Sequence, residues 1–154
     1  MTKEQLEEFE KYDKAKTKVL KYALYKKRTE YEIRQKFYNE IEENMLEDII
    51  ENLKSYGYVG DENYIERAIK EFIALNKLSI KEIKYKLCTK GINSGLIESY
   101  ISDNYEELQN YEVESATKIA KKKLQTMEEA DVKNFLMKKG YSSSSIKQAL
   151  NGGE

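Results

Sequence analysis

The sequence predicts an all-α fold, and three observations support that prediction. Apolar residues recur three and four positions apart along almost the whole chain, as at Ile65, Ile69 and Ile73, which is the spacing of one helix face. No run of strictly alternating apolar and polar residues bounded by turn signals indicates a strand. The chain has no proline, and its seven glycines mark the ends of the periodic segments.

Helix starts are indicated by capping boxes, in which a hydroxyl residue precedes a glutamate by three positions. The hydroxyl can accept from the third backbone amide of the helix, while the glutamate reaches back to the amide of the capping residue. This pattern occurs at Thr29–Glu32, Ser79–Glu82 and Thr126–Glu129. Chance is the alternative explanation, because the sequence is rich in glutamate.

Five positions recur with a constant shift of 49 residues, which indicates an internal repeat. An earlier copy is present as well. Its pair Ile33 and Phe37 precedes Ile83 and Leu87 by 50 residues, and its pair Ile49 and Leu53 precedes Ile97 and Ile101 by 48. In the two later copies, Ile83, Leu87, Gly91, Ile97 and Ile101 correspond to Val132, Leu136, Gly140, Ile146 and Leu150.

Each copy is predicted to hold three helices, and a unit of that size is marginal when alone, so neighbouring copies should pack end to end. We therefore expect three tandem three-helix repeats that form an elongated, curved array. A compact nine-helix bundle is the alternative. The predicted helices cover residues 12–27, 30–40 and 43–56, then 61–76, 80–90 and 94–108, then 111–125, 128–139 and 142–150. The predicted domains are 1–58, which includes an acidic N-terminal extension of the first helix, 59–109 and 110–154.

Composition excludes the commonest kinds of enzyme. The 154 residues suit about one domain, and 27 basic residues nearly balance 28 acidic ones. The absence of histidine removes Ser-His and Cys-His catalysis and the usual zinc ligand sets. No glycine pattern typical of nucleotide binding is present. We therefore expect a protein that is not an enzyme and that has no cofactor and no metal.

The single cysteine and the short apolar clusters indicate the compartment. Cys88 cannot form a disulfide within the chain, and its position beside Leu87 predicts a small core residue, not a nucleophile. No stretch approaches the ~18 apolar residues that crossing a bilayer requires. The expected protein is soluble and cytoplasmic and has no membrane partner.

Charge is segregated by predicted helix. Segments 14–36, 77–90 and 118–147 carry nine, five and eight basic residues against two, one and three acidic ones. Segments 40–51 and 98–114 each carry six acidic residues and no basic one. The first and second helices of each copy are therefore mainly basic and the third helices acidic.

If the copies pack in register, the basic helices form one stripe that could bind a phosphate backbone or an acidic protein groove. Five tyrosines interleave with this stripe: Tyr22, Tyr25, Tyr31, Tyr38 and Tyr85. The alternative is a solvated helix face whose tyrosines lie half in the core. The candidate partner-binding residues are Lys26, Lys27, Arg28, Arg34, Lys36, Lys81, Lys84, Lys86, Lys90, Lys121, Lys122, Lys138 and Lys139.

Three segments resemble the bacterial RecX family of regulatory proteins. They are ALYKKRTEYEI at 23–33, LKSYGYVGDENY at 53–64 and SIKEIKYKLCTKGI at 79–92. The resemblance extends from about Ala15 to Leu150. The chain departs from the family pattern at Gly60, where a second acidic residue is usual, and at Lys77–Ser79, where Lys-Gly-Pro is frequent. Asp61 could still cap the helix that follows it.

The resemblance implies a modulator of the RecA recombinase that binds RecA, or its filament on DNA, and most commonly inhibits it. The expected partners are thus RecA or the RecA–DNA filament, with possible direct contact to DNA, and the expected state is a monomer. A second hypothesis is an independent DNA-binding module that uses its three-helix units like helix-turn-helix elements. A histidine-free enzyme is a third.

Overall fold

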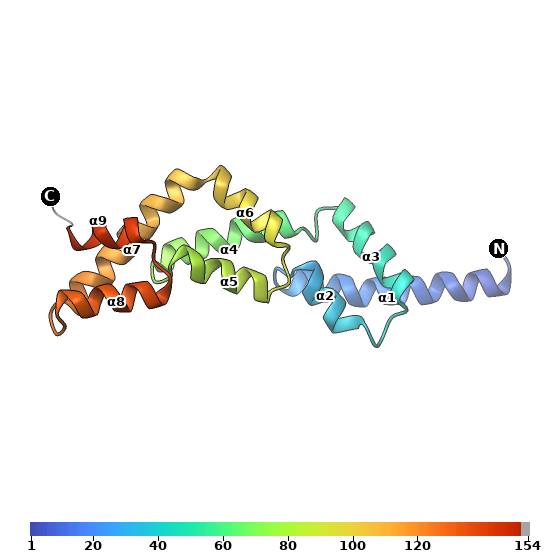
Figure 1. Cartoon of the computed structure of the whole chain (residues 1–154). Coiled ribbons are helices and arrows are strands. Elements are labelled where there is room, and N and C mark those ends of the chain that lie inside the picture. The colour runs from blue at the N-terminus through green and yellow to red at the C-terminus, as the bar shows by residue number, and fades with distance from the viewer. Residues whose placement is uncertain (152–154) are drawn as a thin grey trace. The chain divides into compact units, whose positions relative to one another are not determined.

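The computed structural model describes residues 1–151, and over that range it contains nine α-helices and no strand (Figure 1). The all-α prediction is confirmed. Residues 152–154 of the predicted third repeat lie outside the described residues. The helices are α1 (Lys3–Tyr25), α2 (Glu30–Phe37), α3 (Glu43–Ser55), α4 (Asp61–Leu75), α5 (Ile80–Thr89), α6 (Ser94–Asp103), α7 (Tyr105–Lys123), α8 (Glu129–Lys139) and α9 (Ser143–Leu150).

The chain forms two compact units. Unit 1 comprises Met1–Tyr64 together with Lys90–Ile92, and unit 2 comprises Ile65–Thr89 together with the described chain from Asn93 on. The three-repeat boundaries and the shape of the array stay predictions. The order of helices fits three successive triplets, α1–α3, α4–α6 and α7–α9.

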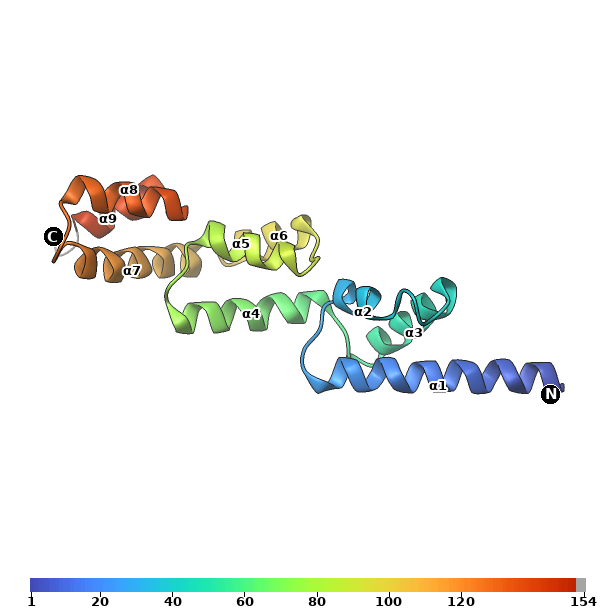
Figure 2. The ribbon, with the colours of Figure 1, turned by 90° about the horizontal axis from the view of Figure 1, so that it is seen from below.

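The core of unit 1 lies among α1, α2 and α3, which pack against one another in both views (Figures 1 and 2). Ile33 and Phe37 lie one turn apart on α2 and are both buried, as their spacing predicts. α3 contributes Ile49 and Leu53 to the same cluster, and α1 contributes Val19.

The core at the C-terminal end of unit 2 lies among α7, α8 and α9. Val132 and Leu136 of α8 are fully buried, and they correspond to the buried Ile83 and Leu87 of α5. Ala116 and Ala120 line the α7 side of this core, where small side chains allow the helices to approach closely. The repeated apolar positions read from the sequence are therefore buried, except Leu150, which is partly buried.

Two of the three predicted capping boxes are confirmed. The Thr29 hydroxyl accepts from the amide of Glu32, and the Ser79 hydroxyl accepts from the amide of Glu82, each at 3.1 Å. The prediction at Thr126 is wrong, because α8 begins at Glu129 and its capping residue is Glu128, two positions after Thr126. An additional box, at Thr2, starts α1.

Further expectations differ from the structure, including the seventh helix, which spans Tyr105–Lys123 in place of the predicted 111–125. The sixth helix ends at Asp103, not 108, because Asn104 leaves helical geometry and its amide and side chain both donate to the carbonyl of Tyr100. Cys88 is exposed, so its prediction as a core residue is wrong. Leu87 takes the buried position, and the next residue lies about 100° further around the helix.

A specific contact in unit 1 joins the start of α2 to the chain just after α5. The Thr29 hydroxyl, besides capping α2, donates to the carbonyl of Lys90 at 2.7 Å, and the Lys90 ammonium lies 3.6 Å from the Glu32 carboxylate. Gly91 follows with φ +79°, and a β-carbon there would collide with the Tyr31 side chain. Glycine is therefore required at this position both for backbone conformation and for space.

The same contact occurs in unit 2, between the start of α5 and the end of α8. The Ser79 hydroxyl donates to the carbonyl of Lys139 at 2.8 Å, and the Lys139 ammonium lies 3.5 Å from the Glu82 carboxylate. Gly140 has φ +99° and packs against the Lys81 side chain. We call these two sets of contacts the repeat junctions.

A carboxylate completes each junction by accepting the first amide of the middle helix. Asp61 accepts from the amide of Glu30 at 3.1 Å, and Glu112 accepts from that of Ile80 at 3.4 Å. The expectation that Asp61 caps its own helix is therefore wrong, since it lies inside the first turn of α4 and caps α2. Burial raises the pKa of the Asp61 carboxyl, and the hydrogen bond from Glu30 opposes that shift.

Candidate partner-binding surface

The thirteen candidate basic residues divide between the two units. Six lie in unit 1, in the α1–α2 connection, on α2 and just after α5: Lys26, Lys27, Arg28, Arg34, Lys36 and Lys90. Seven lie in unit 2, on α5 and in the last turns of α7 and α8: Lys81, Lys84, Lys86, Lys121, Lys122, Lys138 and Lys139. One continuous stripe through all thirteen stays a prediction.

Four of the thirteen are neutralised by acidic groups of the chain itself. Arg34 forms a bidentate pair with Glu47, at 2.7 and 3.1 Å, and a further contact with Glu30 at 3.2 Å. The hydrogen bond that Arg34 donates to Glu47 raises the pKa of Arg34 and lowers the pKa of Glu47. The other three are Lys84, paired with Glu98 at 2.9 Å, and the junction residues Lys90 and Lys139.

Two more of the thirteen contact an aromatic ring. The guanidinium of Arg28 lies 3.9 Å from the centre of the Tyr22 ring, and the Lys36 ammonium lies 5.9 Å from it. Tyr22 is half-buried and packs edge-on against Phe37. These cation–π contacts position both side chains and leave their charge available to a partner.

The remaining seven are exposed and form no ion pair within the described residues: Lys26, Lys27, Lys81, Lys86, Lys121, Lys122 and Lys138. They are the cations of the set that a partner can engage without breaking an internal ion pair. The tyrosines support this surface, since Tyr25 and Tyr85 are 84% and 71% exposed. The alternative of tyrosines half in the core fits Tyr22, which is half-buried, and Tyr31, which is 45% exposed.

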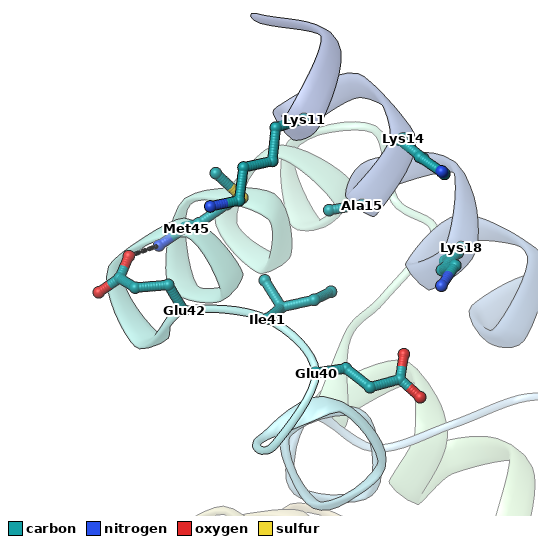
Figure 3. A pocket seen from close by; sticks show the side chains of 8 residues that line it. All are labelled: Lys11, Lys14, Ala15, Lys18, Glu40, Ile41, Glu42 and Met45. Atoms are coloured by element: carbon teal, nitrogen blue, oxygen red, sulfur yellow. Dashed lines mark hydrogen bonds between the residues drawn. The ribbon is translucent and has the colours of Figure 1, made fainter. Parts of the chain in front are cut away.

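A cleft in unit 1 adds cations that the candidate set did not include (Figure 3). Its volume is about 370 Å³, and Lys11, Lys14 and Lys18 of α1 line it together with the apolar Ile41 and Met45. These lysines recur at helical spacing, but the cleft itself depends on where the α2–α3 connection packs, which the sequence pattern does not specify.

One of the two acidic residues that line this cleft, Glu42, is already hydrogen-bonded to the backbone of α3. Glu42 caps α3 by accepting from the amides of Asn44 and Met45, both at 3.0 Å, and this hydrogen bonding lowers the pKa of its carboxyl. Glu40 also lines the cleft. The cleft thus presents a mainly cationic wall over an apolar base.

Among the described residues, no cluster of three or more histidine, cysteine, aspartate or glutamate side chains is arranged to hold a metal ion. No helix in the described part of the chain is both long and apolar enough to cross a bilayer.

Comparison with known proteins identifies the family. A curated protein from Clostridioides difficile named "Regulatory protein RecX" is 32% identical over 149 residues, which cover 92% of this chain and 69% of that protein. A protein of the same name from Clostridium acetobutylicum is 33% identical over 153 residues, covering 93% of this chain and 70% of its own length. The chain belongs to the RecX family.

Solved structures agree with this assignment. A crystal structure of RecX from Lactobacillus salivarius superposes with a TM-score of 0.76 at 25% identity, covering 91% of this chain and 94% of that one. A second RecX crystal structure gives a TM-score of 0.81 at 23% identity, covering 98% and 80%, and shares the fold. No protein-family model matches the chain. The relatives are named regulatory proteins.

Proposed function

We propose that this RecX family member is a non-enzymatic, monomeric, cytoplasmic regulator that binds the RecA recombinase or its DNA filament and inhibits strand exchange and filament extension. Membership of the RecX family is the observation that supports the proposal most strongly. The resemblance of residues 23–33, 53–64 and 79–92 to that family implies RecA as the target.

The exposed lysines are the proposed contact residues. Seven of the thirteen candidates have no acidic partner within the described chain, so they can pair with acidic protein side chains or DNA phosphates. Lys81 and Lys86 lie on the same short helix, α5, beside the exposed Tyr85.

The test is inhibition of RecA-catalysed strand exchange and of RecA ATPase on single-stranded DNA. Substoichiometric wild-type protein should inhibit both. Replacing Lys81→Glu together with Lys86→Glu should raise the concentration needed for half-inhibition about tenfold, because like charges then face the partner's acidic groups. Circular dichroism should show unchanged helicity, since neither lysine has an internal ion pair.

The matched control is Lys3→Glu with Lys118→Glu. Both lysines are exposed and lie outside the candidate set, and the change in net charge is the same. Equal loss of inhibition in both double variants would contradict a localised basic surface. Tight duplex binding without RecA, with a steep salt dependence, would instead support the DNA-binding alternative.

A further inference from the structure

An ion pair joins the middle helix to the third helix in the first two triplets. In α2–α3 the pair is Arg34 with Glu47, at 2.7 Å, and in α5–α6 it is Lys84 with Glu98, at 2.9 Å. Each pair places opposite charges across the two helices of the triplet. In these two triplets the cation of the middle helix is therefore already paired with a carboxylate of the chain itself.

The third triplet lacks this pair because both positions carry lysine. The residues 49 positions after Lys84 and Glu98 are Lys133 on α8 and Lys147 on α9. Both line a groove of about 530 Å³ between these helices, and neither forms an ion pair within the described residues. Neither belongs to the thirteen candidate residues discussed above.

The groove has an apolar base between its two lysines. Met137, Ile146 and Leu150 line it, and the Met137 side chain is 54% exposed. A flexible thioether adapts its shape to an incoming apolar side chain. The groove thus offers two ammonium groups around an apolar surface.

We propose that the α8–α9 groove binds an acidic peptide segment of a partner protein. A carboxylate of the segment pairs with Lys133 and Lys147 and so supplies the acidic partner that Glu98 gives to Lys84 in the second triplet. An aliphatic side chain of the segment packs on Met137, Ile146 and Leu150. Glu129 lines the groove as well, which directs the acidic groups toward the lysines. A nucleic acid backbone fits less well, because it has no aliphatic side chain for the apolar base.

The experiment uses fluorescence anisotropy with the full chain and a labelled peptide that alternates glutamate pairs with leucine. The wild type should bind this peptide saturably with one peptide per chain. Lys147→Glu should weaken binding about tenfold or more, because the new carboxylate pairs with Lys133 and repels the peptide. Its melting temperature should be unchanged or raised by up to about 3 °C, since an exposed ion pair is gained.

The control is Lys118→Glu, an exposed α7 residue that lies outside both the groove and the candidate set, which should bind the peptide within about twofold of wild type. Lys133→Glu is a second variant with the same expected loss. The proposal is overturned if the wild type does not bind, if Lys147→Glu binds as tightly as wild type, or if a serine-for-leucine peptide or a single-stranded oligothymidylate binds equally well. The assay contains no RecA, so its failure is separate from failure of the proposed function.

Discussion

At the scale of single residues, Tyr141 and Ser115 form a hydrogen-bonded pair of hydroxyl groups in the buried interior. Their oxygens lie 2.6 Å apart, and both residues are almost inaccessible to solvent. Burial raises the pKa of the Tyr141 phenol to about 12, although the hydrogen bond with Ser115 opposes the shift. The protonated phenol is thus the form that the folded chain stabilises.

This shift predicts a loss of stability at high pH. The folded pKa of about 12 exceeds the ordinary value of 10.0, so the contribution is complete below pH 10 and is lost as pH rises from 10 to about 12. Two pKa units correspond to about 2–3 kcal/mol. Urea unfolding of Tyr141→Phe should show a shallower decline over that interval than wild type.

The control for this prediction is Tyr85→Phe, which removes an exposed phenol. Its stability should follow the wild-type pH dependence. If Tyr141→Phe and wild type declined in parallel from pH 10 to 12, the buried phenol would not be the group that titrates.

At the scale of elements, the sequence predicted the parts of each junction that depend on local pattern. The boxes at Thr29 and Ser79 and the glycines at Gly91 and Gly140 have fixed spacing from the apolar core positions. The hydroxyl donation to the next helix end was not predicted, because it depends on tertiary packing. The carboxylates of Asp61 and Glu112 lie 51 residues apart, so a search with a slightly different shift would have found them.

The capping box predicted at Thr126 shows why local sequence pattern alone does not determine where a helix begins. The sequence there matches the box as well as at Thr29, yet α8 begins at Glu129. Thr126 instead donates its amide to the carbonyl of Lys123, extending the turn at the end of α7. The competing interaction at the preceding helix end decided the start of α8.

The junction glycines lead to a prediction at this scale. Gly57 and Gly91 have nearly the same φ, +76° and +79°, but a β-carbon at Gly57 meets open space while one at Gly91 meets Tyr31. Gly57→Ala should cost about 1 kcal/mol from backbone strain alone. Gly91→Ala should cost about 2–3 kcal/mol because the Tyr31 side chain must also move.

Chemical denaturation of the two variants measures this difference directly. Gly140→Ala should lower the free energy of unfolding as Gly91→Ala does, since Lys81 and Ser79 lie within 3.1 Å of the added carbon. Equal destabilisation by Gly57→Ala and Gly91→Ala would mean that the junction in unit 1 adjusts without cost.

At the scale of the whole molecule, the hydrophobic cores are separate clusters. One belongs to α1–α3 of unit 1, and another to α7–α9 of unit 2. The periodicity of the sequence predicted several buried residues of both, such as Ile49 and Leu136. Charge pattern predicted the surface less well, because the alternation of basic and acidic helices does not reveal which lysines pair internally. Lys84 and Lys86 are equivalent in sequence terms, but only Lys84 has an acidic partner on the facing helix.

Because the cores are separate, a cavity made in one of them should destabilise that core and leave the other unchanged. Ile49→Ala, at a fully buried position in unit 1, should destabilise that unit by about 2–5 kcal/mol. Amide hydrogen exchange should accelerate in α2 and α3, while the α8 amides around Leu136 keep their protection. Leu136→Ala should give the reverse pattern. A uniform acceleration over both units would show that the chain unfolds as one cooperative body.

The junction chemistry also sets a rule for building longer versions of this molecule. Where the first two middle helices begin at a hydroxyl, Thr29 and Ser79, the third begins after Glu128, whose side chain makes no capping bond. A carboxylate cannot donate a hydrogen bond to a carbonyl oxygen. An engineer grafting another triplet onto α9 would therefore have to install threonine or serine at position 128 before the added module could dock in the native manner.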